Sequence, residues 1–229
     1  MTKKVINIKK IPDLARVSEF LNRDSFNGFT QDDLFIMQFV KKGWGQDIAA
    51  LSNMAEALMN ASRAKLIIPS DVKRLLGRVV LRALHEKVSP YRKDPRVVNK
   101  FGHYGYYLEH LNIILGCYQS AVDDEYLKLN LRVTEHLIAL SSAEKNCHAP
   151  LLPNVRMRWS ADQAAIIYSI WLYDQNNGTC LSDDLRDKWL NYMDTSMRDP
   201  ETRLYMTEVM GVKRYSKQPR GCALAYLIY

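Results

Sequence analysis

A carboxylate and a tryptophan stand at the start of one apolar helical pattern, where they could take part in acid–base chemistry. Asp162 lies two residues after Ser160, and Trp159 comes immediately before that serine. As a general acid or base, Asp162 would need a pKa raised by burial. A carboxylate in a first helical turn is also stabilised by the helix dipole without any further role. Both interpretations of Asp162 are open, and Trp159 is a candidate for contacting a substrate.

Two histidines and two tyrosines share a second apolar segment. His103 and His110 are seven residues apart, which would place them on nearly one face of a helix. Tyr106 and Tyr107 lie within one turn of them. These side chains could protonate a leaving hydroxyl group or orient a polar substrate, or they could be hydrogen-bonded core residues. A metal site is not expected, because helix positions i and i+7 lie about 10 Å apart along the axis.

Two further sequence features suggest chemistry only weakly. Arg220 precedes an apolar helical stretch, where an arginine can bind a carboxylate or phosphate group beside a helix start, although a surface turn explains it equally. Cys147 and His148 look like a nucleophile beside its base, but adjacent side chains point in different directions. No cofactor is expected, because the sequence has neither a GxGxxG fingerprint nor a P-loop.

The composition is that of a globular protein without disulfide bonds. The chain has 229 residues, 47% of them hydrophobic, which is enough for a sizeable core. Its four cysteines are widely separated, so we expect free thiols. No apolar run approaches the roughly 20 residues of a membrane span, and the first residues do not form a secretory signal. We therefore expect a cytoplasmic protein without a membrane span.

The net charge of +7 is concentrated in one segment, residues 73–100, which carries nine basic residues against Glu86 and Asp94. Arg74, Arg78 and Arg82 repeat every four residues and would form a stripe along a helix. The stripe could meet an acidic partner, but a solvated outer face is the favoured interpretation. Nucleic-acid binding is not expected, because aromatic residues do not alternate with these charges and no nucleic-acid-binding motif is present.

Apolar residues recur at helical spacing along most of the chain, and alternating strand patterns are nearly absent. Capping boxes at Thr30–Asp33 and Ser160–Gln163 mark helix starts. The first helix of each predicted pair is richer in small and apolar residues than the second, which suggests an inner and an outer layer. The sequence thus predicts an all-α chain of consecutive helical hairpins. The predicted pairs are 46–63 with 71–88, 103–121 with 125–143, and 160–174 with 183–198.

A further inner helix is predicted to open at Gly221, and the sequence ends at Tyr229 after about two turns. An end this apolar is expected to pack on its own chain, to meet another copy in a homo-oligomer, or to continue in a longer protein.

Three segments resemble linalool dehydratase/isomerase-like proteins: 102–118 (GHYGYYLEHLNIILGCY), 159–179 (WSADQAAIIYSIWLYDQNNGT) and 218–226 (QPRGCALAY). The resemblance runs loosely from about residue 30 onward. It implies an (α/α)6 toroid, of which this chain would be a part, treated as a single domain over 1–229 with the last hairpins missing. It also implies a central cavity in which water is lost from or added to an apolar alcohol by acid–base catalysis.

The resemblance assigns residues to that cavity. Ungapped alignment of SIWLYDQNNGT places one family cysteine at Asp162, and the other reaches Cys147 only across an insertion. The family histidine falls near His103 or His110, and Tyr106 and Tyr107 become cavity residues.

We therefore expect a lyase or isomerase that acts on a small hydroxylated molecule. Its acid–base groups would be Asp162 with His103 or His110, assisted by Tyr106, and a carbohydrate-active hydrolase is the second enzymatic hypothesis. Two non-catalytic hypotheses are also open, namely a scaffold that binds an acidic partner through 73–100 and an incomplete domain. The substrate-binding candidates are Trp159, Tyr107, Arg220 and Cys147.

Overall fold

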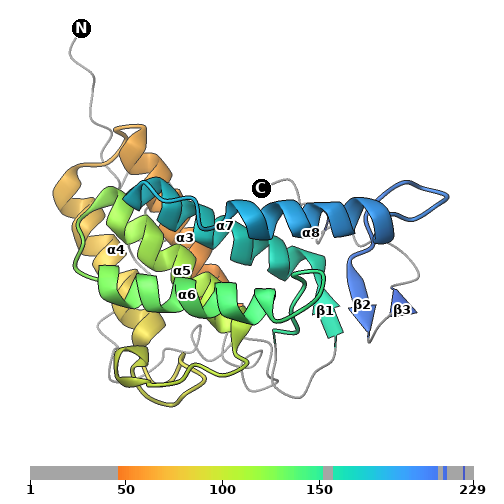
Figure 1. Ribbon diagram of the computed structural model, residues 1–229. Coiled ribbons are helices and arrows are strands. Elements are labelled where there is room, and N and C mark those ends of the chain that lie inside the picture. The colour runs from red at the N-terminus through yellow and green to blue at the C-terminus, as the bar shows by residue number, and fades with distance from the viewer. Residues whose placement is uncertain (1–45, 152–156, 211–213, 216–223, 225–229) are drawn as a thin grey trace, which may run out of the picture. The chain divides into compact units, whose positions relative to one another are not determined.

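The computed structural model describes residues 46–151, 157–210, 214–215 and 224, and this part of the chain is mostly helical (Figure 1). The prediction of a mainly helical chain is confirmed, although the described residues also form a small sheet. The Thr30–Asp33 capping box, Arg220 and the helix expected after Gly221, apart from Leu224, lie outside the described residues. The helices are α3 (Gln46–Arg63), α4 (Pro69–Leu84), η3 (Pro95–Val97), α5 (Gly105–Ala121), α6 (Leu127–Ser142), α7 (Ser160–Asn177) and α8 (Asp183–Ser196).

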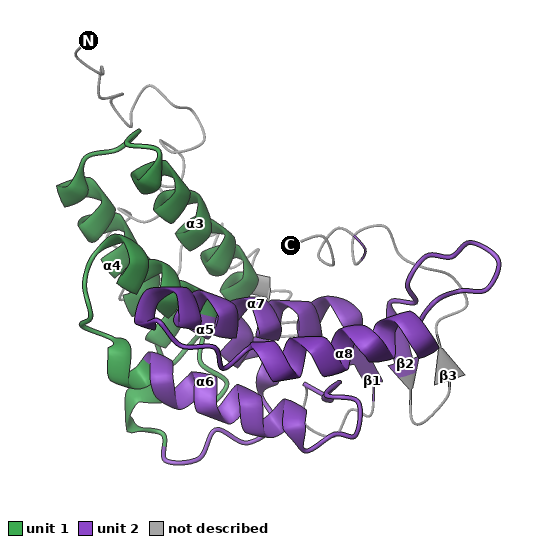
Figure 2. Ribbon diagram, turned by 45° about the horizontal axis from the view of Figure 1, so that its top comes forward, with its two compact units in different colours: residues 1–98, 113–129 green, residues 99–112, 130–229 purple. Residues whose placement is uncertain are grey.

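The chain divides into two compact units, coloured separately in Figure 2. Unit 1 comprises residues 1–98 and 113–129, and unit 2 comprises 99–112 and 130–229, so that α5 and α6 each contribute to both. In unit 1, α3 and α4 pack against each other as a hairpin. The buried face of α4 follows the helical period and is entirely aliphatic. That face consists of Val72, Leu75, Leu76, Val79, Val80, Ala83 and Leu84.

Unit 2 contains three short strands that the sequence did not predict: β1 (Met157–Trp159), β2 (Glu208–Met210) and β3 (Arg214–Tyr215). They form an antiparallel sheet in the order β1, β2, β3, with Trp159 opposite Glu208. Strands of two or three residues are too short to show the alternation by which strands are recognised in a sequence. Since β1 leads directly into α7, the sheet fixes where the helix carrying Asp162 begins.

The predicted capping box at the start of α7 is wrong. Trp159 occupies the cap position and makes no side-chain capping bond, while Ser160 is already helical. The Ser160 hydroxyl donates to the carbonyl oxygen of Met206 at 2.9 Å, and its backbone N–H donates to that of Thr207 at 3.1 Å. Gln163 accepts a bond from the backbone N–H of Ala149. These polar groups therefore tie the helix start to neighbouring segments rather than to the helix itself.

The start of α5 also differs from the prediction. The helix begins at Gly105 rather than at residue 103, so that His103 precedes it and is exposed. His103 and His110 consequently do not share a helix face. The segment that precedes α5 is held in place by α6, because His136 Nε2 lies 2.8 Å from the carbonyl oxygen of Gly102.

Buried polar side chains join three helices of unit 2. The Asn112 amide on α5 donates to Thr134 Oγ1 on α6 at 3.0 Å and to Ser169 Oγ on α7 at 3.1 Å. Asn130 on α6 donates to Asn112 Oδ1 at 2.7 Å. Because a slipped helix would leave these buried groups unpaired, the cluster fixes the register of α5, α6 and α7.

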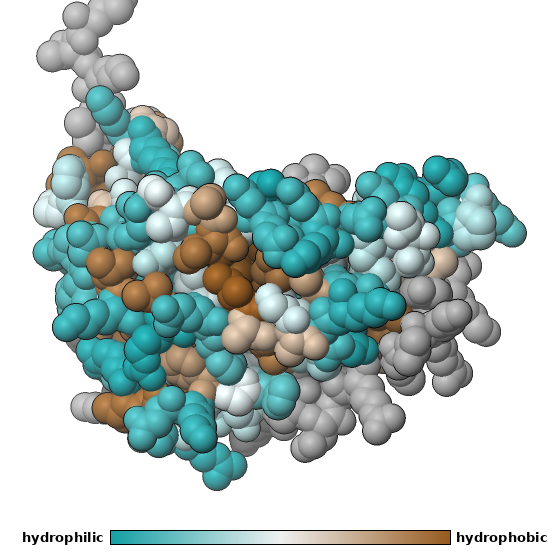
Figure 3. All heavy atoms as spheres, viewed as in Figure 1, coloured by the Kyte–Doolittle hydropathy of each residue, from teal (hydrophilic) through white to brown (hydrophobic). Residues whose placement is uncertain are grey.

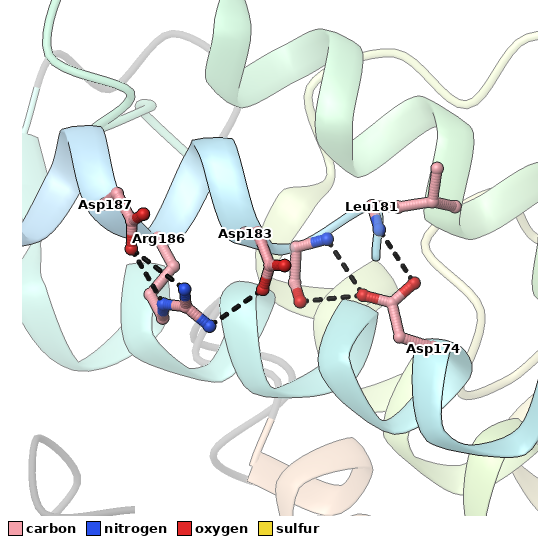
Figure 4. A network of polar contacts seen from close by, with 6 residues as sticks. Asp174, Leu181, Asp183, Arg186 and Asp187 are labelled. Atoms are coloured by element: carbon pink, nitrogen blue, oxygen red, sulfur yellow. Dashed lines mark hydrogen bonds and ion pairs between the residues drawn. The ribbon is translucent and has the colours of Figure 1, made fainter. Parts of the chain in front are cut away.

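The turn between α7 and α8 is organised by one buried carboxylate (Figure 4). Asp174 accepts bonds from the backbone N–H groups of Leu181 and Ser182 and from the hydroxyl groups of Thr179 and Ser182. Burial alone would raise the Asp174 pKa, but these hydrogen bonds outweigh it, and the pKa is lowered. Gly178 ends α7 in the left-handed conformation that glycine adopts most readily.

The outer face of α8 is charged, and hydrophilic residues cover most of this helix in Figure 3. Its buried side is narrow and consists of Leu185, Trp189 and Met193. Within the described part of the chain, no helix is long and apolar enough to cross a membrane.

Two glycines provide a matched test of how tightly α5 is packed. A Cβ atom at Gly105 would lie 2.6 Å from Leu151 Cδ2, whereas a Cβ at Gly77, in α4, would meet no atom within 4 Å. We expect Gly105→Ala to lower the free energy of unfolding by roughly 1–3 kcal/mol. We expect Gly77→Ala to raise it by about 0.5–1 kcal/mol, because alanine favours helices. Urea unfolding measures both, and equal effects of the two substitutions would contradict this packing.

A second prediction concerns Asp174. Asp174→Asn places an amide opposite buried donors, so we expect a loss of about 2–3 kcal/mol of unfolding free energy at pH 7. Because the native pKa is lowered, this stabilisation is present above pH about 4 and is lost as the pH falls through the native pKa. The difference between wild type and variant should therefore shrink below pH 4. The exposed Asp187→Asn is the control, and a constant difference down to pH 2 would contradict the role of the ionised carboxylate.

Candidate acid–base site

Two carboxyl groups of unit 2 interact electrostatically in the interior. Glu109 on α5 is only 1% exposed, and its Oε2 atom has no hydrogen-bond partner within the described part of the chain. Its pKa is raised well above the usual value, first by burial and then by the negative charge of Asp162 on α7. Burial raises the pKa of Asp162 to about 7, although the residue retains some exposed surface. The charge of Asp162 thus acts on a second, buried carboxyl group.

The raised pKa values of the two carboxyl groups have different causes. Glu109 is affected by the charge of Asp162, whereas burial alone accounts for the raised pKa of Asp162. The charge of an ionised Asp162 therefore opposes the ionisation of Glu109. Near neutral pH Asp162 is partly ionised. A pair whose two pKa values differ can supply one acid and one base.

His110 lies beside Glu109 as a neutral ring. Its Nε2 atom is 3.7 Å from Glu109 Oε1, but burial lowers the His110 pKa to about 4. At neutral pH the histidine is uncharged, so that this contact is not an ion pair. Tyr106 packs edge-on against His110 with ring centroids 4.9 Å apart.

The remaining predicted residues are distributed more widely. Tyr107 is buried on α5, and Trp159 is half-buried at the end of β1. Cys147 is buried after α6 and has a positive φ of 52°. His103 is exposed before α5, and Arg220 lies outside the described residues. Of the four residues proposed for catalysis, the structure thus places His110 and Tyr106 in mutual contact. Asp162 is related to them only through its electrostatic effect on Glu109, the neighbour of His110.

The Cys147–His148 pair does not have the properties of a nucleophile and its base. Burial raises the pKa of the Cys147 thiol, which disfavours the thiolate. Burial also lowers the pKa of His148 to about 4. The His148 ring packs edge-on against Trp189 and Tyr192 of α8, with centroids 6.3 and 5.8 Å away. These contacts are those of a core histidine.

Glu109 was missed because sequence reasoning concentrated on the histidines beside it. It is the one acidic residue in the largely apolar stretch from Tyr106 to Tyr118, and all residues from Tyr107 to Tyr118 are buried. An isolated charge in a fully buried helix is expensive, which is the signal that could have identified it. Its pairing with Asp162 could not be foreseen, since the two residues are far apart in the sequence.

Unit 1 carries a separate surface feature in the basic segment. A cavity of about 440 Å³ is lined by Leu81, Leu84, His85, Glu86, Asp94 and Arg96. Arg96 is held there by two bonds to Asp94 Oδ2, at 2.6 and 2.9 Å. Nearby, Arg74 pairs with Asp71 and Lys73 pairs with Asp123. Several of the basic charges are thus balanced within unit 1.

Among the residues that the structure describes, no group of three His, Cys, Asp or Glu side chains is arranged to hold a metal ion. Comparison of the chain with models of protein families and with curated proteins finds no match.

Proposed function

We propose that unit 2 catalyses acid–base chemistry on a small hydroxylated substrate, as a lyase or isomerase that removes, adds or moves a hydroxyl group. The observation that supports this most strongly is the buried carboxyl group of Glu109, whose Oε2 atom has no hydrogen-bond partner among the described residues and whose ionisation is opposed by the charge of the half-buried Asp162. An uncharged acid beside a carboxylate base is the arrangement that such chemistry requires. The sequence resemblance to linalool dehydratase/isomerase-like proteins points to the same class of reaction and to a partial (α/α) toroid.

In the proposed reaction, Glu109 donates its proton to the hydroxyl group of the substrate, and the C–O bond breaks with release of water. Asp162 then accepts a proton from the neighbouring carbon, and the C–H electron pair becomes the new double bond. Addition of water follows the same steps in reverse. The neutral His110 ring, held by Tyr106, positions Glu109, while Trp159 and Tyr107 are proposed to contact the apolar part of the substrate.

Hydrolysis of a glycoside is the second candidate, because glycosidases also use two carboxyl groups, one protonated and one ionised. The pairing of Glu109 with Asp162 supports this candidate as well. The two reactions are distinguished by their products, since a hydrolase releases a reducing sugar and a dehydratase releases an alkene. A scaffold that binds an acidic partner through 73–100 is less well supported, because Arg74 and Lys73 are paired with aspartates.

The catalytic proposal predicts large losses from small substitutions. Against a panel of small alcohols and glycosides, we expect Asp162→Asn and Glu109→Gln each to lower kcat/KM by about 10²–10⁴-fold. Activity should rise with pH as Asp162 ionises near pH 7 and fall at higher pH as Glu109 loses its proton. Glu135→Gln, which changes an exposed carboxylate on α6, is the control. Retention of wild-type turnover by Asp162→Asn would refute the proposal.

The same pair predicts that loss of activity is accompanied by a gain in stability. Because the native pKa of Asp162 is raised, its ionisation costs stability as the pH rises from about 4 to 7. We therefore expect Asp162→Asn to unfold at higher urea concentration than wild type at pH 8, by up to about 4 kcal/mol. The difference should be small at pH 5, where the wild-type carboxyl is protonated. A variant that is less stable than wild type at pH 8 would show that the carboxylate is stabilised in the native state.

A further inference from the structure

The cavity of unit 1 lies at the end of α4. Its volume of about 440 Å³ is within the range of sites that bind small molecules. One part of its lining is the last turn of α4 and the two residues that follow this helix, and the other part is the segment around η3. All the lining residues belong to unit 1, so the cavity is separate from the carboxyl groups of unit 2.

Two leucines of α4 form an apolar wall of this cavity. Leu84 is 2% exposed, whereas Leu81 is 46% exposed. The wall therefore extends from the core of unit 1 to the surface. An exposed leucine in a cavity is apolar area that a ligand can remove from water.

The cavity also has a negative side. Glu86 and Asp94 are the only acidic residues of the basic segment 73–100, and both line it. Asp94 is paired with Arg96, whereas the Glu86 side chain makes no ion pair or hydrogen bond with any described residue. The carbonyl groups at the end of α4 add partial negative charge beside Glu86. This side of the cavity favours an ammonium group.

Arg96 supplies a positive group that is held in place. Asp94 Oδ2 accepts bonds from Arg96 Nε at 2.9 Å and from Nη2 at 2.6 Å, and Asp94 Oδ1 accepts one from the Arg96 backbone N–H at 2.8 Å. Burial alone would raise the pKa of Asp94, but these bonds outweigh it, and the pKa is lowered. A guanidinium group fixed in this way loses little freedom when it binds a carboxylate, and the excess charge of segment 73–100 attracts anions.

We propose that this cavity binds a small zwitterion with an aliphatic side chain, such as a free amino acid of the leucine type. The ammonium group of the ligand pairs with Glu86, its carboxylate pairs with Arg96, and its side chain covers Leu81 and Leu84. A ligand with a single charge satisfies only one of the two charged sides, and a ligand without an aliphatic part leaves the leucines in water. This binding site lies outside the proposed catalytic unit and does not depend on its activity.

The test is an NMR titration of the ¹⁵N-labelled full chain with L-leucine at about pH 6.5, where both charges of the ligand are present. We expect a dissociation constant on the order of 1 mM. The shifts should be concentrated at the residues that line the cavity. Three probes each lack one feature of leucine: 3-methylbutylamine lacks the carboxylate, 4-methylpentanoate lacks the ammonium group, and glycine lacks the side chain. Each should bind at least about threefold more weakly than leucine.

Variants of the two charged residues assign each contact. Glu86→Gln should weaken leucine binding by about threefold or more without weakening that of 4-methylpentanoate. Arg96→Gln should weaken binding of leucine and of 4-methylpentanoate, but not that of 3-methylbutylamine. Both side chains are exposed, so the circular dichroism of these variants should match wild type, and Glu135→Gln in unit 2 is the control.

Three results would overturn the proposal. The first is the absence of localised shifts at a leucine concentration about tenfold above the expected dissociation constant. The second is binding of either singly charged probe as tightly as leucine. The third is an unchanged affinity for leucine in both Glu86→Gln and Arg96→Gln.

Discussion

A carboxyl group enclosed by protein and lacking a positive partner holds its proton more tightly than it does in water, and ionising it costs the folded state free energy. Unit 2 accepts this cost at Glu109 and Asp162. Small proteins have little free energy of unfolding to spare, so that such a pair persists only where the surrounding packing determines its position. The packing and hydrogen bonds that hold α5 and α7 in unit 2 meet this requirement.

Three separate arrangements hold the helices that carry the pair. Gly105 lets Leu151 approach the first turn of α5 more closely than any side chain would permit. The Asn112 cluster joins α5 to α6 and α7 one turn beyond Glu109. The bonds from Ser160 to Met206 and Thr207 fix the start of α7 two residues before Asp162. Each arrangement uses hydrogen bonds or close packing that would be lost if a helix moved.

The helices could be predicted from the sequence because helical periodicity is a local signal that extends over many residues. The Leu129, Val133 and Leu137 pattern in α6 is an example, and all three residues are buried. The sheet could not be predicted, because its strands are too short and because β1 and β2 pair across about fifty residues. Ser160 fits the sequence pattern of a capping box, but its hydroxyl group donates a hydrogen bond to the distant Met206 carbonyl instead of capping α7. Asp162 was identified from its position, whereas Glu109 is distinguished only by its burial and by its electrostatic interaction with a distant segment.

The central claim is that the buried Glu109 and the half-buried Asp162 interact and both have a raised proton affinity. Carbon-13 NMR of the side-chain carboxyl groups, assigned with Asp162→Asn and Glu109→Gln, measures this directly. The account predicts that Asp162 titrates near pH 7, that the pKa of Glu109 is well above its usual value, and that the Glu109 pKa falls when Asp162 is replaced. Titration of both groups near pH 4, independent of each other, would contradict it.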